Sequence, residues 1–541
     1  MKICFIWVKE FRSFKNFGLN LSSDYVYEFN ESTNSLSRKK QKSLPSNFYG
    51  NGVEDITGLF GKNGSGKSNC LELICMLLKG GKSKVKSDFL IVYEEDGHIF
   101  CSISMKDIRY IGPKSNFEVN YQKYEKEITG INVIYFSNVY DRRPNNFSPQ
   151  VSDLSMNNLA KKSKQKFNSF FDQIDFIESS KFKLLEIPIP SQFCIEIDII
   201  PKFKNISIKT KFDREIANLN KVIKSRLRDL TTKTKFTLSL NYSVFLSLLN
   251  SVENRSAESI KLLEFNLNGY LNDLIESNFK SKDLSKNLLE MTSKIAKELL
   301  PIKELHEFED YLDKIGALED LVPLIEIESI KNNSMKESFV VNMTYSKSDD
   351  FALLLKCLRN NDKTLCSWLG ISSGHVAYLN LFSSIFKELF RSRNDVILCI
   401  DEGDLYLHPQ WQIEFFDKLL NVLPNLSTGK VQIVLTSHSP FLLSDLPNQS
   451  ITVLSSDETN HATTGSDIEQ LTFGANLYEL YSNLFFLNKN RTGVFANKKI
   501  KKLLTQIEET DTDVKPKDVQ LFSEIIGDKV IKHILDKGGN E

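Results

Sequence analysis

The sequence predicts an α/β fold in which a mixed sheet is flanked by helices and a helical arm is inserted into the chain. Largely apolar runs at 56–60, 396–400 and 431–435 have the length and composition of strands that are buried on both faces. Apolar residues at helical spacing lie next to these runs. Residues 211–320 separate the first run from the other two and read mostly as helix. We therefore expect two lobes of one head on either side of a helical insertion.

The helical arm sets the expected domain boundaries. Apolar stripes at helical spacing run through residues 216–230, 262–275 and 288–300. They are too short for a long coiled coil and indicate a compact arm. We therefore divide the chain into an N-terminal lobe at 1–200, a mainly helical insertion at 201–335 and a C-terminal lobe with a helical tail at 336–541.

Composition narrows the function classes. The 541 residues carry 69 Lys and Arg against 69 Asp and Glu, so net charge gives no general attraction to nucleic acid or membranes. The eight cysteines are dispersed singly, which predicts reduced core residues. No apolar stretch approaches a membrane span, and Met1–Trp7 reads as a first strand and not as a signal peptide. We expect a cytoplasmic protein with no membrane partner.

A glycine-rich loop follows the first buried run. Residues Gly61–Ser68 read Gly-Lys-Asn-Gly-Ser-Gly-Lys-Ser, which fits the phosphate-binding loop pattern between a strand and a helix. Backbone N–H groups at the positive end of a helix suit the phosphates of a nucleotide, with Lys67 reaching the β- and γ-phosphates and Ser68 binding Mg²⁺. We expect ATP and Mg²⁺ as cofactors. The predicted binding residues of this loop are Asn63, Gly64, Ser65, Gly66, Lys67, Ser68 and Asn69.

Two carboxylates follow the run at 396–400. In a parallel sheet the carboxyl ends of the strands are where ligands bind, so Asp401 and Glu402 are expected at the nucleotide. We predict that Asp401 holds Mg²⁺ and that Glu402 polarises the water that attacks the γ-phosphate. The next strand, at 431–435, leads to His438, which we predict to contact the γ-phosphate.

A serine-glycine turn lies upstream of the acidic strand. Ser372, Ser373 and Gly374 begin a segment with helical apolar spacing, and such a helix start can bind an anion. By itself this signal is weak, because serine is a common helix cap. In the N-terminal lobe, the run Ile131–Phe136 indicates another strand, with Tyr135–Asn138 at its end.

In their order, these motifs resemble the ATP-binding cassette (ABC) heads of the SMC, RecF and OLD-like families. The resemblance implies an ABC-type ATPase head, with Gly61–Ser68 as Walker A, Asp401–Glu402 as the end of Walker B, Ser372–Gly374 as the signature and His438 as the switch histidine. In such heads the signature contacts the γ-phosphate held by a second copy, so a homodimer or higher oligomer closed by ATP is implied. This chain departs from the pattern at His375, where Glu or Gln is usual, and at Gly403, where proline is usual.

The tail supports a narrower resemblance. Leu471–Leu480 and Gly493–Ala496 look like the C-terminal region of PtuA-type ATPases of Septu and retron-associated antiviral systems. That resemblance implies a PtuB-like HNH nuclease as partner and, in retron-linked versions, a reverse transcriptase with its msDNA. Residues 439–541 are too few for the Toprim domain of OLD nucleases, and we interpret Asp511-Thr512-Asp513 as a loop. We expect an ATPase without a nuclease of its own.

Two other functions stay open at this point. A RecF- or SMC-like repair ATPase would clamp DNA by itself and bind it in a salt-dependent way. A nucleotide-binding scaffold that hydrolyses ATP weakly is compatible with the departure at His375.

Overall fold

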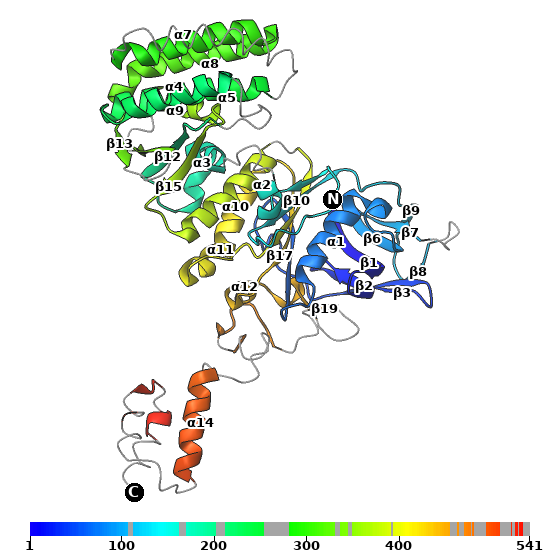
Figure 1. Cartoon of the computed structure of the whole chain (residues 1–541). Coiled ribbons are helices and arrows are strands. Elements are labelled where there is room, and N and C mark those ends of the chain that lie inside the picture. Colours follow the sequence, from blue (N-terminus) through cyan, green and yellow to red (C-terminus); the bar gives the residue numbers. More distant parts are fainter. Residues whose placement is uncertain are drawn as a thin grey trace.

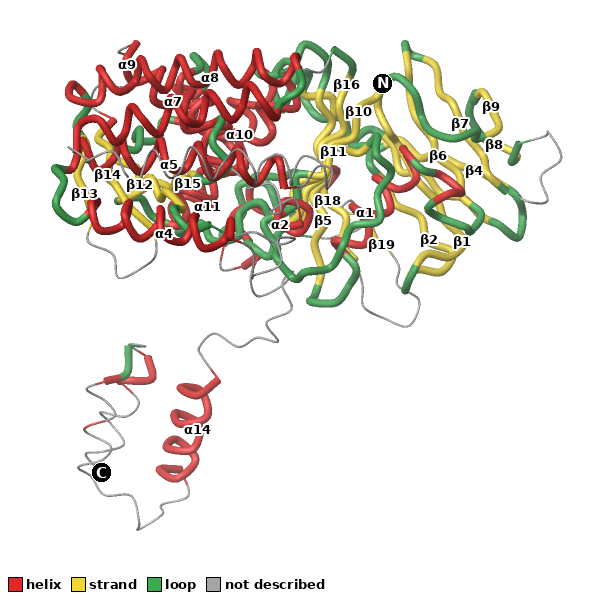
Figure 2. The backbone as a smooth tube through the Cα atoms, turned by 45° about the horizontal axis from the view of Figure 1, so that its top comes forward, coloured by secondary structure: helices red, strands yellow, loops and turns green. Residues whose placement is uncertain are grey.

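The computed structural model describes most of the chain and arranges it around several sheets (Figure 1). Residues 1–105, 112–161, 169–201, 211–253, 281–330, 336–343, 349–390, 393–454, 462–464, 470–477, 479–480, 494–508, 521, 525–527 and 530–533 are described. The predicted α/β fold class is confirmed. Figure 2 shows strands and helices intermixed in the head and a helix-rich unit beside it.

A seven-stranded sheet forms the centre of the head, in the order β11-β10-β16-β17-β5-β18-β19. All its neighbouring strands are parallel except the edge pair β18–β19. The three predicted apolar runs and the run at 131–136 are confirmed as four adjacent strands of this sheet. The strands are β5 (Val53–Gly61), β10 (Ile131–Ser137), β11 (Val151–Asp153), β16 (Asp395–Asp401), β17 (Val431–Thr436), β18 (Ile451–Leu454) and β19 (Ala462–Thr464).

Helices cover both faces of this sheet, which explains its continuous apolar runs. On one face, α1 (Lys67–Lys79) packs against Ile397 and Cys399 of β16. On the other face, α10 (Ser373–Leu389) and α11 (Pro409–Val422) pack against Val396, Leu398 and Ile400. Successive side chains of a strand point to opposite faces, so a strand covered on both sides has no polar alternation.

Two smaller sheets complete the N-terminal part. One has the order β2-β1-β6-β7-β9, and the other has the order β3-β4-β8. Lys2–Trp7 lies in β1, so the first strand predicted at Met1–Trp7 is confirmed. The bounds are β1 (Lys2–Phe11), β2 (Phe14–Asn20), β3 (Tyr25–Asn30), β4 (Ser35–Lys40), β6 (Phe89–Glu95), β7 (His98–Ser104), β8 (Lys114–Ser115) and β9 (Asn120–Lys123).

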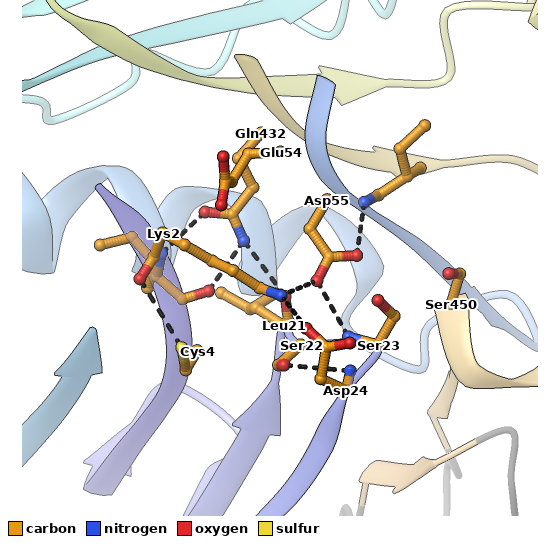
Figure 3. Close-up of polar contacts among 12 residues, drawn as sticks. Lys2, Cys4, Leu21, Ser22, Ser23, Asp24, Glu54, Asp55, Gln432 and Ser450 are labelled. Carbon is orange, nitrogen blue, oxygen red and sulfur yellow. Dashed lines mark hydrogen bonds and ion pairs between the residues drawn. The ribbon is translucent and has the colours of Figure 1, made fainter. Parts of the chain in front are cut away.

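A buried polar joint connects the first strand to the central sheet (Figure 3). Lys2 Nζ lies 2.6 Å from Asp55 Oδ2 and 2.8 Å from Asp24 Oδ2. The Gln432 side chain accepts from the backbone N–H of Ile3 and donates to its carbonyl, each at 2.8 Å. The buried charges are paired, as burial requires, and they fix β1 against the amino ends of β5 and β17.

A fourth sheet, β13-β14-β12-β15, lies under the helices of the arm (Figure 1). This sheet and the helices of the arm share one apolar core. The predicted domain boundaries at residues 200 and 335 remain predictions. This sheet takes β12 from before residue 200 and β14 and β15 from after residue 335. The elements are α3 (Ser169–Glu178), β12 (Gln192–Asp198), α4 (Lys211–Leu227), α5 (Thr232–Glu253), α7 (Ser281–Leu299), α8 (Ile302–Leu321), β13 (Ile327–Ile330), β14 (Lys336–Asn342), α9 (Asp349–Arg359) and β15 (Thr364–Leu369).

The remaining elements include the short helices α2 (Met156–Lys161) and α12 (Pro440–Ser444) and the tail helix α14 (Val494–Glu508). The predicted stripe at 262–275, residues 481–493 of the tail and Asp511–Asp513 lie outside the described residues. All eight cysteines are buried and free, as predicted. None of the helices in the described part combines the length and the apolar character that a membrane span needs.

Candidate nucleotide-binding site

The loop between β5 and α1 has a backbone that needs its glycines. Gly61 and Gly66 have φ values of 151° and 94°, in the region that disfavours side chains. A Cβ on Gly61 would lie 2.5 Å from the carbonyl oxygen of Leu454, and one on Gly66 would lie 2.6 Å from the Phe14 ring. Gly64, at φ 81°, has open space around it. The loop is therefore tight at both ends and open at its tip.

The polar groups of this loop fit a phosphate. Lys67 Nζ donates to the carbonyls of Gly61 and Lys62 at 3.0 and 3.3 Å, and burial lowers the pKa of Lys67. Ser65 Oγ is buried and has no hydrogen-bond partner within the described residues. Helix α1 begins after Gly66 with no side-chain cap, so its first N–H groups are available to an anion.

The ends of three parallel strands converge on Asp401. Strand register places Ser137 of β10 and Thr436 of β17 beside it. Thr436 Oγ1 donates to Asp401 Oδ1 at 2.8 Å, Ser68 Oγ donates to the same oxygen at 3.0 Å, and Ser137 Oγ donates to Oδ2 at 3.3 Å. Burial raises the pKa of Asp401. These carboxylate and hydroxyl oxygens are the ligand type that Mg²⁺ prefers.

Glu402 and His438 face each other beside Asp401. His438 Nε2 lies 3.4 Å from Glu402 Oε1, and this hydrogen bond lowers the pKa of Glu402. The Glu402 backbone is left-handed, with φ 49°, and its N–H donates to Thr436 Oγ1 at 3.0 Å. An ionised half-buried carboxylate next to the phosphate loop can accept a proton from water. The structure thus brings Lys67, Ser68, Asp401, Glu402 and His438 into one site.

The serine-glycine turn at Ser372–Gly374 differs from the phosphate loop, because a side chain caps the helix that follows it. Ser372 caps α10 by accepting the N–H of His375 at 3.2 Å, and both Ser372 and Ser373 are exposed. A Cβ on Gly374 would meet the carbonyl oxygen of Tyr406 at 3.5 Å and the Trp411 ring at 3.6 Å. None of the contacts recorded for this turn, within the described residues, reaches the phosphate loop.

Both departures from the family pattern have a packing reason. The His375 ring is buried and lies edge-on to Trp411, with ring centroids 5.7 Å apart, and burial lowers its pKa. A Cβ on Gly403 would lie 2.6 Å from Ile400 Cγ2 and 3.0 Å from the Phe415 ring. A larger residue at 403 would therefore displace the core beneath Asp401.

A cleft of about 430 Å³ opens beside Ser68 and Asp401. It is bordered by Arg12, whose guanidinium donates to the side chains of Asn69 and Glu72. Asn69, predicted to bind the nucleotide, thus has a partner in the protein, whereas Asn63 is exposed at the loop tip. The role of each predicted site residue in binding or catalysis stays a prediction.

Sequence reasoning assigned no role to two polar residues of this site. Thr436 bonds both Asp401 and the Glu402 backbone, and Ser437 Oγ donates to Asp404 Oδ2 at 2.6 Å. Thr436 and Ser437 immediately precede His438, which is the one signal that pointed to them. Their partners depend on how β16 and β17 are paired, and sequence spacing does not give that register.

Comparison with known proteins shows the family of this chain. A family model described as AAA ATPase domain matches residues 1–443, a range that includes the phosphate loop, the serine-glycine turn, Asp401, Glu402 and His438. A solved structure of the recombination mediator protein RecF with ATPrS aligns with 85% of this chain and 97% of the RecF chain, at 12% identity and a TM-score of 0.23. A TM-score this low carries no structural argument.

Curated relatives match shorter segments. The Septu protein PtuA of Bacillus thuringiensis is 30% identical over 139 residues, which are 24% of this chain and 31% of that protein. The Retron Vc95 probable ATPase of Vibrio cholerae serotype O1 biovar El Tor is 25% identical over 169 residues, 27% of this chain and 31% of that protein. The chain therefore spans less than a third of these relatives' length in the match. The predicted resemblance to PtuA-type ATPases is confirmed at this level of identity.

Proposed function

Because this chain belongs to the AAA ATPase domain family, whose model covers residues 1–443, we propose that it binds ATP with Mg²⁺ and hydrolyses it to ADP and phosphate. The observation that carries the proposal is the convergence of Lys67, Ser68, Asp401 and Glu402 at the carboxyl edge of the parallel sheet. Open α/β sheets bind ligands at this edge.

In the proposed reaction, the loop N–H groups and Lys67 hold the phosphates, and Ser68 and Asp401 hold Mg²⁺. The described residues contain no cluster of three or more His, Cys, Asp or Glu side chains that could hold a metal ion. Ser68 and Asp401 would hold Mg²⁺, since hydroxyl and carboxylate oxygens are the ligands this ion prefers. When bound, it neutralises charge on the phosphates. Glu402 accepts the proton of the attacking water, and His438 orients Glu402 and contacts the γ-phosphate.

The variant Glu402→Gln tests the hydrolysis step. It keeps the size of the side chain but removes the proton acceptor, so ATP should still bind while hydrolysis slows by about 10²–10⁴-fold. Nucleotide binding by titration calorimetry and phosphate release under single-turnover conditions measure the two effects separately. Hydrolysis at the normal rate would show that Glu402 is not the base.

We propose further that the site is completed by a second copy of the chain. The exposed Ser372 and Ser373 at the N-terminus of α10 support this, because none of the contacts found for them among the described residues reaches the phosphate loop of their own chain. Two copies related by a twofold axis would each place this turn on the ATP held by the other. Binding of ATP would then favour the closed dimer, and hydrolysis would release it.

The biological role that we propose is regulation of a nuclease in antiviral defence. The support is the similarity to Septu PtuA proteins and to a retron ATPase. The partner would be a PtuB-like HNH nuclease, with a reverse transcriptase and its msDNA in a retron-linked system. Purification of the tagged chain from its host, followed by mass spectrometry, tests this role. Recovery of an HNH protein encoded beside it is expected, whereas tight binding to DNA without any partner would contradict it.

A further inference from the structure

A second buried hydroxyl–carboxylate contact joins the turns that follow β16 and β17. Ser437 Oγ donates to Asp404 Oδ2 at 2.6 Å. The side chains are almost completely removed from solvent, with exposed fractions of 1% for Ser437 and 6% for Asp404. A buried carboxylate is costly unless it accepts hydrogen bonds. The burial of the Asp404 carboxylate therefore needs an explanation in terms of stability or function.

The contact fixes the turn that carries His438. Ser437 Oγ also accepts the backbone N–H of Ser439 at 2.8 Å, so residues on both sides of His438 are tied to one hydroxyl. That hydroxyl is in turn held by Asp404. The His438 side chain leaves this turn toward Glu402. Because the histidine itself is substantially exposed, its direction depends on the backbone beneath it.

The two turns contact each other at successive residues. Thr436 bonds Asp401 and the Glu402 backbone, Ser437 bonds Asp404, and His438 faces Glu402. The hydrogen bond between Ser437 and Asp404 reaches neither the phosphate loop nor Asp401. Through Ser437 the Asp404 carboxylate holds the turn that carries His438, and its charge also interacts with Glu402 and His438.

We propose that Asp404 is a positioning residue for ATP hydrolysis, which through Ser437 holds His438 against Glu402 without touching the nucleotide. This inference rests on the proposed function, since it assigns a role within the same reaction. It predicts an effect on turnover and not on nucleotide binding, because the phosphate loop and Ser68 do not depend on the Asp404 contact.

Four variants of the full chain test the inference. Asp404→Leu and Ser437→Ala each remove the contact, and we expect either to lower kcat by about 10–100-fold, as loss of an orienting contact typically does. Asp404→Asn keeps an acceptor oxygen and should restore kcat to within a few-fold of the unmodified protein. The double variant Asp404→Leu/Ser437→Ala should be no slower than either single variant, because both remove one interaction. The Kd for ATP should stay within about twofold in all four.

Ser285→Ala is the matched control. Ser285 Oγ donates to Glu319 Oε1 at 3.0 Å in the helical unit, so this change also removes a largely buried serine–carboxylate bond but leaves the site intact. Its kcat should not change. If Asp404→Leu fails to fold, as judged by circular dichroism and thermal unfolding, Ser437→Ala and Asp404→Asn carry the test; a folded variant that has lost ATP binding contradicts the inference.

The inference is overturned if the Asp404→Leu or Ser437→Ala protein hydrolyses ATP at the normal kcat, or if the two losses multiply in the double variant. A wrong proposed function gives a distinguishable result. In that case the Glu402→Gln variant hydrolyses ATP at the normal rate, whatever the rates of the Asp404 variants.

Discussion

Lys67 is held within its own loop, where a phosphate would take over its contacts. Its ammonium donates to the carbonyls of Gly61 and Lys62, and burial lowers its pKa, so the cation gains when an anion arrives. Lys67→Ala should therefore weaken ATP binding by about 100-fold, since a hydrogen bond to a charged group is worth roughly 1.5–3 kcal/mol and more than one is lost. Equilibrium titration with a fluorescent ATP analogue measures this change.

Lys82→Ala is the control for that measurement. Lys82 forms a partly exposed pair with Asp88 at 3.8 Å and lies beyond the end of α1, so its loss should leave ATP affinity unchanged. Equal affinities for the Lys67→Ala and unmodified proteins would mean that nucleotide binds elsewhere.

At the residue scale, local patterns predicted the groups that the site gathers. Gly61–Ser68, Asp401, Glu402 and His438 each stand at a strand end that is recognisable from the sequence. Asp404 was not predicted, because its role depends on a bond to a turn 33 residues away. A contact of this kind appears only when two strands are in register, which local sequence does not encode.

At the scale of elements, the joint at Lys2 makes the smaller β1 sheet and the central sheet one unit. Lys2 and Asp55 are 7% and 1% exposed. Burial alone would lower the pKa of Lys2, but the Asp55 and Asp24 carboxylates outweigh it and the pKa is raised. The stabilisation from this pair is therefore fully present below the pKa of an unfolded lysine and is lost as pH rises through the higher folded value.

Replacing Asp55 by asparagine should destabilise the head measurably. Breaking a buried ion pair leaves an uncompensated charge and costs about 3–5 kcal/mol, and we expect the lower end because Lys2 keeps Asp24. Urea unfolding at neutral pH measures the free energy. Glu54→Gln is the control, because Glu54 pairs with the exposed Lys430 and such pairs contribute about 1 kcal/mol or less. An equal loss of unfolding free energy in both variants would show that the buried Lys2–Asp55 pair contributes no more than an exposed pair.

The elements themselves were predicted better than their pairing. Periodicity gave the strands at 56–60, 131–136, 396–400 and 431–435, and the structure places them side by side. The pairing of β12 with β14 was not predicted, because Cys194 lies opposite Val340 across the whole helical arm. A sheet assembled over such a separation leaves no local signal.

At the scale of the whole molecule, the proposed dimer makes a prediction about mixtures. Ser373→Arg should leave ATP binding to a single chain intact and impair hydrolysis, because Ser373 is exposed and lies outside the recorded contacts of its own phosphate loop. Lys67→Ala impairs the other half of the same composite site. In a heterodimer of the two variants, one site has both defects and the other has none.

Mixing the two inactive proteins should therefore restore hydrolysis. With random assortment and independent sites, half of the dimers are mixed and each has one intact site, so about a quarter of the normal rate is expected. Phosphate release as a function of mixing ratio should peak near equal amounts. A mixture of Lys67→Ala with Glu402→Gln should stay inactive, because both changes lie in the half of the site that holds the nucleotide and no dimer then has an intact site. A rate that never exceeds the sum of the separate variants would show that each chain completes its own site, and the exposed serines of α10 would then need another role.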